Sequence, residues 1–240
     1  KVYLYDGTGT TKLDSTFTDA LGKYTFDSLV TGAYKVKFVA PAGTIPAKQN
    51  LGKDVTDSDA NKAGWSQVIN IDATKLVTDT LRNNPQIDAG FVPVGSIGDY
   101  VWTDTNNNGQ QDGTEAPLKG VKVYLYDGTG TVKLDSAVTD AAGKYLFDSL
   151  LAGSYKVKFV SPTGMIPAKQ NFGTDTKDID ANKQGLSQVI NLNTTLPIAD
   201  TLRNNPQIDA GFVPVGSIGD YVFNDKDNSN TQTAGDTPIK

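Results

Sequence analysis

The chain repeats itself at a fixed spacing. The segment KVYLYDGTGT begins at Lys1 and again at Lys122, and RNNPQIDAGFVPVGSIGDYV begins at Arg82 and again at Arg203. Both pairs are 121 positions apart (122 − 1 and 203 − 82), and the two copies align without insertion or deletion. A unit of this length can bury a hydrophobic core of its own, unlike the short units of a solenoid. The repeat therefore predicts tandem domains.

The repeat also predicts the domain boundaries. If a unit starts at Gly95, residues 95–215 form one complete repeat. Residues 1–94 are then the C-terminal part of a preceding repeat, and residues 216–240 are the first strand and loop of a following one. No Ser/Pro-rich linker interrupts GFVPVGSIGDYV at the boundary, so we expect neighbouring domains in close, fixed contact. We expect a window from a longer array, and the start, KVYLYDGTG, has no signal peptide.

Short alternating runs between turn signals predict strands in the complete repeat. In YKVKF, residues 155–159, the lysines alternate with apolar side chains, which is typical of a sheet with one solvent-exposed face. We expect an all-β fold, with tandem Ig-like or prealbumin-like β-sandwich domains of about seven strands. The predicted strands are 97–103, 120–126, 133–139, 145–150, 154–160, 187–192 and 207–213.

A polar segment between the first two predicted strands matches a calcium loop. DTNNNGQQDGTE, residues 104–115, fits the spacing D-x-[DN]-x-[DN]-G-x₅-E at every specified position. Gly109 would make the sharp turn, and Glu115, the chain's only Glu, has the reach for bidentate binding. The flanking residues have strand composition, so we predict an EF-hand-like loop between strands; the alternative is an ordinary polar turn. The candidate Ca²⁺ ligands are Asp104, Asn106, Asn108, Gln110 through its carbonyl, Asp112 and Glu115.

A second acidic set lies in the long polar connection after Pro162. Its members are Asp175, Asp178, Asp180 and Asn182, and the preceding repeat has Asp54, Asp57, Asp59 and Asn61 in register. Either a second metal site or a solvated acidic loop would explain this spacing. Paired aspartates also occur in glycosidases, but an acidic pair alone is a weak signal of catalysis.

The following repeat carries a variant of the first loop. Its candidate ligands are Asp225, Asp227, Ser229 and Asp236. Asn230 replaces the turn glycine and can adopt the left-handed conformation at some cost. Asp236 replaces Glu115 and is one methylene shorter, so we expect weaker or more magnesium-like binding at this loop.

Composition excludes most other classes of function. The chain has no Cys and no His, which removes disulfide scaffolds, Cys/His zinc sites and His-based acid–base chemistry, and we expect no enzyme. A net charge of −5 with only two arginines argues against nucleic acid and anionic membranes as partners. No apolar run approaches the length of a membrane span.

These motifs together resemble a known family. The runs GDYVWTDTNNNGQQDGTEAPLKGVKVYLYDGTG and TDAAGKYLFDSLLAGSYKVKFVSPTG, with the Asp-rich loop and IDAGF, resemble the B domains of serine-aspartate repeat (Sdr) surface adhesins across the whole repeat. The resemblance implies a collagen-adhesin B-type sandwich, several bound Ca²⁺ ions per domain and a place outside the bacterial cell, on its surface or secreted. It supports the first loop as a ligand set and favours Asp175, Asp178 and Asp180 as a second one.

The same resemblance raises the question of a crosslink. Related collagen-adhesin B modules often carry a Lys–Asn isopeptide bond promoted by Glu or Asp. Phe159 stands where the promoting carboxylate would be expected, so we predict no crosslink in this chain.

Three functions remain open. The leading hypothesis is a stalk of tandem domains, rigidified by calcium and partnered by neighbouring repeats; since the first loop follows the boundary closely, its ion could also fix the orientation of neighbours. The second is an extracellular filament: residues 216–240 supply the segment that residues 1–94 lack, so one subunit could donate its last strand to the next. The third is a ligand-binding adhesin module that uses aromatic side chains such as Tyr124, Tyr126 or Trp102, although we expect these side chains to pack in the sandwich.

Overall fold

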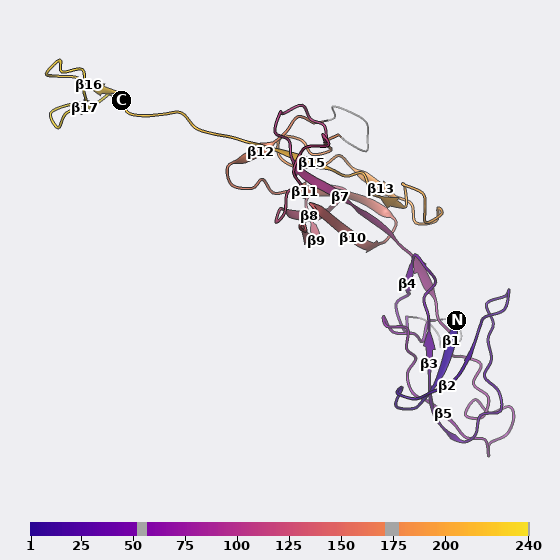
Figure 1. Ribbon diagram of the computed structural model, residues 1–240. Helices are drawn as coiled ribbons and strands as arrows, with labels where there is room; N and C mark the ends of the chain where they lie inside the picture. The colour runs from indigo at the N-terminus through magenta and orange to yellow at the C-terminus, as the bar shows by residue number, and fades with distance from the viewer. Residues whose placement is uncertain (52–56, 171–177, 240) are drawn as a thin grey trace.

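The structure is a computed structural model that describes residues 1–51, 57–170 and 178–239. The regular elements in these ranges are strands, and none of the described residues forms a helix that could cross a membrane. Two bodies of strands follow one another along the chain (Figure 1). A tail then leads from the second body to a small C-terminal hairpin of β16 (Phe223–Asn224) and β17 (Thr237–Pro238).

The first body has a four-stranded antiparallel sheet and a separate strand pair. The sheet order is β2-β1-β3-β5. Its strands are β1 (Val2–Asp6), β2 (Lys12–Thr16), β3 (Gly32–Phe38) and β5 (Ile69–Ile71). The pair joins β4 (Thr44–Pro46) to β6 (Phe91–Pro93) near the second body (Figure 1).

The second body contains two sheets, of four and five strands. One has the order β13-β11-β8-β9, with β8 (Lys122–Asp127), β9 (Lys133–Val138), β11 (Gly153–Phe159) and β13 (Ile190–Leu192). The other has the order β10-β7-β15-β12, with β14 also paired to β7. Its strands are β7 (Gly95–Thr103), β10 (Lys144–Leu150), β12 (Met165–Pro167), β14 (Asn204–Asn205) and β15 (Ala210–Pro214).

Strand β7 is central to its sheet. It pairs antiparallel with β10 and parallel with β14 and β15, so three segments from different parts of the repeat depend on it. Ile97, Val101 and Trp102 on β7 are fully buried. Gly95 begins β7 directly after Val94, and the nine residues of the strand place the loop at 104–115 about 30 Å from that junction. The first loop is therefore remote from the boundary with the preceding body, contrary to our expectation that it could fix that boundary.

Each body has its own hydrophobic cluster. The cluster of the second body lies among its strands and includes Trp102, Phe147, Phe159 and Phe212. The first body has a smaller one, built on Val2, Leu4, Tyr34, Val36, Phe38, Ala60 and Ile71. The alternation predicted for residues 155–159 is confirmed, because Val157 and Phe159 are buried while Lys156 and Lys158 are half-buried.

The predicted all-β sandwich is confirmed, and a strand lies within or across each of the seven predicted ranges. The sequence did not predict β12 and β14. Two or three residues are too few to show alternation, and these strands exist because β15 and β7 offer them hydrogen-bonding partners.

Candidate metal sites

The loop at 104–115 is joined to the core by its first residue. Asp104 is 0% exposed, and its backbone N–H donates to the carbonyl of Phe212 at 3.0 Å. A Cβ on Gly211 would lie 3.3 Å from the Asp104 Cβ, so β15 packs tightly against this residue. The N–H of Thr103 donates to the carbonyl of Ala116 at 2.9 Å and closes the base of the loop. The core thus fixes where the loop begins and ends.

The Asp104 carboxylate organises the turn of the loop. Its Oδ1 accepts the N–H of Asn108 at 3.2 Å, and its Oδ2 accepts the N–H of Gly109 at 2.9 Å. Gly109 has φ 79°, in the left-handed region that a glycine adopts without strain. The turn glycine therefore has the conformation that the loop motif requires.

The other predicted side-chain ligands converge on Asp112. The amides of Asn106 and Asn108 donate to Asp112 Oδ2 at 2.8 and 2.9 Å, and Glu115 Oε2 accepts the N–H of Asp112 at 3.0 Å. Rotation of each amide about its terminal bond exchanges its nitrogen and oxygen, so Asn106 and Asn108 can each turn an oxygen towards Asp112. The carboxylate oxygens of Asp104, Asp112 and Glu115 themselves do not all lie within 4.8 Å of one another in the described part of the chain. Gln110 is exposed, which suits a ligand that acts through its carbonyl. This oxygen-only donor set fits Ca²⁺.

The hairpin loop at 225–236 repeats the arrangement. Asp225 accepts the N–H groups of Ser229 at 3.0 Å and Asn230 at 2.9 Å, as Asp104 does in the first loop. Asp236 accepts the N–H of Thr233 at 2.7 Å, the counterpart of the bond between Glu115 and its loop. Asn230 has φ 57°, so it adopts the left-handed conformation expected of it.

Three carboxylates meet in the loop at 225–236, which we call the third loop. Oxygens of Asp225, Asp227 and Asp236 lie within 4.8 Å of one another, and no other three acidic groups in the described part of the chain do so. The Ser229 hydroxyl lowers the pKa of Asp227, and the N–H of Thr233 lowers the pKa of Asp236. Both carboxylates are therefore charged at neutral pH, as metal ligands must be.

The second acidic set is only partly described. Asp54 and Asp175 lie outside the described residues. Asp178 and Asp180 both line a cavity of about 370 Å³, and Asp180 Oδ2 accepts the N–H of Asp209 at 2.7 Å. The first body shows the matching pairing of Asp59 with the N–H of Asp88 at 2.9 Å, and Asp57 is half-buried there.

Asp209 is a further candidate ligand that the sequence did not identify. It is 1% exposed; its Oδ1 accepts the N–H of Tyr100 at 3.0 Å, and no described group hydrogen-bonds its buried Oδ2. Burial, and then the charge of Asp99, raise the pKa of Asp209 to about 8. A nearby cation would relieve this cost. The signal was present in the motif IDAGF, which places one carboxylate in an otherwise apolar run.

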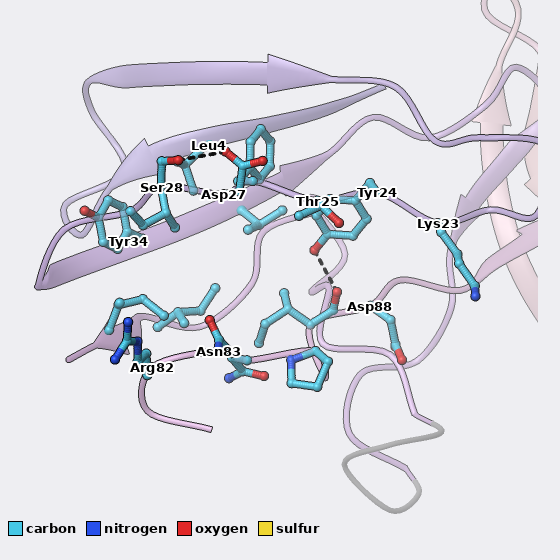
Figure 2. A pocket seen from close by; sticks show the side chains of 18 of the residues that line it. Leu4, Lys23, Tyr24, Thr25, Asp27, Ser28, Tyr34, Arg82, Asn83 and Asp88 are labelled. Atoms are coloured by element: carbon cyan, nitrogen blue, oxygen red, sulfur yellow. Dashed lines mark hydrogen bonds between the residues drawn. The ribbon is translucent and has the colours of Figure 1, made fainter. Parts of the chain in front are cut away.

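The first body has an open groove where the second body holds β7. The groove has a volume of about 910 Å³, and Figure 2 shows Lys23, Tyr24 and Asp27 along one wall with Asn83 and Asp88 along the other. The counterpart of the first wall in the second body is β10, but residues 23–29 form no strand.

The two walls are joined in both bodies by the same tyrosine contact. The Tyr24 hydroxyl donates to the carbonyl of Ile87 at 2.7 Å (Figure 2), and the Tyr145 hydroxyl donates to that of Ile208 at 2.7 Å. The open groove thus keeps part of the arrangement that surrounds β7.

The C-terminal tail has the sequence that fills this position in the second body. Residues 216–222 repeat GSIGDYV from the start of β7, yet they form no strand. Ile218 is 106% exposed, whereas Ile97, its counterpart in β7, is 0% exposed. An apolar strand sequence therefore lies outside any sheet.

The three aromatic side chains considered for ligand binding are buried or half-buried. Trp102 is fully buried and stacks on Tyr100 with ring centroids 5.9 Å apart, so the suggestion that it binds a ligand is wrong. Tyr124 and Tyr126 are half-buried, and the Lys133 ammonium lies 4.8 Å from the Tyr124 ring centroid.

Comparison with known proteins gives a consistent set of matches. Residues 1–91 and 95–212 match the family model described as SdrD B-like domain. Serine-aspartate repeat-containing protein F of Staphylococcus epidermidis is 39% identical over 97% of this chain, which spans 13% of that protein. Serine-aspartate repeat-containing protein D of Staphylococcus aureus (strain Newman) is 38% identical over 95% of this chain, which spans 16% of that protein. The solved minor pilin GBS52 of Streptococcus agalactiae is 16% identical, with 91% of this chain and 85% of that chain covered and a TM-score of 0.31.

Proposed function

Because the chain belongs to the SdrD B-like domain family, we propose that it is a stalk segment of a bacterial surface protein, made rigid by Ca²⁺ bound in the loops at 104–115 and 225–236. The observation that carries this proposal is the shared internal geometry of the two loops, in which Asp104 and Asp225 hold equivalent turns. The family is a structural one, which confirms that the chain is not an enzyme.

The residues of the chain explain how an ion would stiffen it. A bound Ca²⁺ supplies positive charge that offsets the repulsion between neighbouring carboxylates. Asp104 links the loop directly to β7 and β15, so order in the loop is transmitted to the core. Ordering each loop residue costs about 1–2 kcal/mol, and binding to the folded state alone offsets part of that cost.

The acidic residues of the long connection form a proposed second site. Asp178, Asp180 and Asp209 would supply oxygens, together with Asp175, and the buried Oδ2 of Asp209 supports this assignment. Asp54, Asp57 and Asp59 would play the same part in the first body.

The proposed domain division is 1–94, 95–215 and 216–240. The separate hydrophobic clusters of the two bodies support it. The proposed partners are neighbouring repeats of the same protein, outside the bacterial cell. The net charge of −5 gives nucleic acid and anionic lipid no attraction to this segment.

Thermal unfolding of the full chain in calcium, magnesium and EDTA tests the proposal. We expect a higher melting temperature in calcium than in EDTA, with protection of the loop at 104–115 against protease. Isothermal titration calorimetry gives the number of ions bound. Identical melting and cleavage in calcium and EDTA would contradict calcium rigidification.

The open groove favours strand donation as a second candidate function. Residues 216–224 of one chain would enter the groove of another in the register of β7, with their apolar side chains buried. In a longer array, the strand equivalent to β7 of the same repeat would fill the groove within one chain.

Light scattering of the 240-residue chain at increasing concentration tests strand donation. We expect association that removal of residues 216–240 abolishes. A chain that stays monomeric at all concentrations, or a truncated chain that associates equally, would exclude it.

A further inference from the structure

One arginine lies buried at the junction between the two bodies. Arg203 is 8% exposed, and its guanidinium donates to three backbone carbonyls. Nε donates to Val94 O at 3.1 Å, Nη1 donates to Leu196 O at 2.9 Å, and Nη2 donates to Gly43 O. Leu196 belongs to the second body, whereas Val94 and Gly43 precede Gly95. Arg203 therefore binds both sides of the junction.

The other arginine, Arg82, shows which hydrogen bonds this position makes when no neighbouring body adjoins it. Arg82 occupies the equivalent place in the first body, within the same RNNPQIDAGFVPV sequence. It is exposed, and the structure gives its side chain one hydrogen bond, from Nη1 to Lys75 O at 2.9 Å. Lys75 is the counterpart of Leu196, so the contact within the body is kept. The two contacts across the junction are specific to Arg203.

The preceding body presents a shaped acceptor for this arginine. Gly43 has φ 71°, and a Cβ there would lie 2.4 Å from Arg203 Nη2 and 3.1 Å from Ile198. Any side chain at this position would collide with the guanidinium. The N–H of Val94 donates to Gly43 O at 2.9 Å, which brings the two acceptor carbonyls together.

The second body presents the same acceptor at its own far end. The N–H of Val215 donates to Gly164 O at 2.9 Å, and Gly164 has φ 75° with open space around it. The carbonyls of Gly164 and Val215 thus repeat the pair that Arg203 binds. This acceptor is formed before any arginine reaches it.

The backbone of Arg203 also holds the start of β7. Its carbonyl accepts the N–H of Ser96 at 3.2 Å, and a Cβ on Gly95 would lie 2.0 Å from that oxygen. Gly216, the counterpart of Gly95 in the tail, has no neighbour within 4 Å of such a Cβ. Both the side chain and the main chain of Arg203 therefore fix the residues that connect the bodies.

We propose that Arg203 is a metal-independent latch between repeats, which binds a socket made of the Gly43 and Val94 carbonyls of the preceding repeat. The socket of Gly164 and Val215 fits the corresponding arginine of a following repeat, so the same contact recurs along an array. The planar guanidinium keeps its charge and carries N–H donors on three nitrogens, so it can bind several carbonyls at once. A lysine ammonium carries all its donors on one nitrogen. The latch lies about 30 Å from the loop at 104–115, at the opposite end of β7, and goes beyond the proposed calcium function.

Distances between spin labels on the two bodies test the latch. The chain has no cysteine, so Ser15→Cys and Ser136→Cys place labels at equivalent exposed positions of β2 and β9. Pulsed electron–electron double resonance of the full chain should give a narrow distance distribution, alike in EDTA and in calcium. Arg203→Ala should broaden it about twofold or more, because bodies without a fixed interface move freely. Arg82→Ala is the matched control and should leave it unchanged.

Substitutions at Gly43 and Gly164 give a second, independent test of the latch. Gly43→Ala and Gly164→Ala introduce the same backbone strain, but Gly43→Ala alone blocks an occupied socket. Gly43→Ala should broaden the distribution and Gly164→Ala should not. This comparison decides the matter if Arg203→Ala fails to fold, as judged by Trp102 fluorescence in a Trp65→Phe background. A distribution unchanged by Arg203→Ala, an equal effect of Arg82→Ala, or broadening of the unaltered chain by EDTA alone would overturn the proposal. Equal melting temperatures in calcium and in EDTA would contradict the calcium function, but they would not change the expected distance distributions.

Discussion

Replacement of Asp104 by Asn separates two contributions of the first loop to stability, the buried hydrogen bonds of the Asp104 carboxylate and the binding of calcium. Asp104→Asn keeps the size of the side chain but turns one carboxylate oxygen into an NH₂ group. Both oxygens accept backbone N–H groups, from Asn108 at 3.2 Å and Gly109 at 2.9 Å, in a fully buried position. A buried donor left without its acceptor costs about 1–3 kcal/mol. We expect a loss of that size in EDTA.

In calcium, the variant should lose further unfolding free energy because it binds the ion less well. At a hundredfold excess over the dissociation constant, the unaltered chain gains about 2.7 kcal/mol from binding to the folded state. The variant lacks one of the three carboxylates of the loop and should lose most of this gain. The difference in unfolding free energy should therefore grow from about 1–3 kcal/mol in EDTA to roughly 4–6 kcal/mol in calcium. Urea unfolding followed by Trp102 fluorescence, in a Trp65→Phe background because the chain has a second tryptophan, measures it.

Asp225→Asn provides the matched control for this experiment. Asp225 accepts the equivalent N–H groups at 3.0 and 2.9 Å, but its hairpin lies apart from the second body (Figure 1). Its replacement should leave the unfolding of the second body unchanged in both conditions. An equal effect of Asp104→Asn in EDTA and in calcium would refute the claim that the loop binds the ion.

Three further results are expected. Burial raises the folded pKa of Asp209 from the ordinary value of 3.8 to about 8, so the stability that is present below pH 4 falls as the pH rises towards 8. Asp209→Asn should remove up to about 6 kcal/mol of this pH dependence in urea unfolding in EDTA, and a parallel pH profile for the variant would contradict this expectation. The variant Asn230→Gly/Asp236→Glu should raise the calcium affinity of the third loop in calorimetry, since it restores the unstrained turn and the longer carboxylate; an unchanged affinity would argue against both causes. Intact mass should show no loss of ammonia, because Phe159 replaces the promoting carboxylate, and a deficit of one ammonia per domain would show a crosslink.

Much of the fold could be predicted because its causes are local. Alternation of apolar and polar side chains specifies the long strands, as the buried Val157 and Phe159 show. The loop at 104–115 was found from spacing alone, because the hydrogen bonds that shape it join residues only a few positions apart. The candidate ligand Asp209 was not identified from the sequence, since its hydrogen-bonding partners Tyr100 and Asp180 lie far away in the sequence.

The period of the repeat, the strand-forming runs and the oxygen-rich composition of the loops follow directly from the amino-acid sequence. Which of two closely similar segments forms a strand depends on the neighbours that the folded chain offers it. KYLFDSL at 144–150 forms β10, but KYTFDSL at 23–29 forms no strand; GSIGDYV belongs to β7 at 95–101 and to no sheet at 216–222. A strand satisfies its backbone N–H and C=O groups only through a neighbour, and these segments differ in having one. Arg82 and Arg203 differ for the same reason, because a buried guanidinium needs acceptors that only an adjoining body can supply.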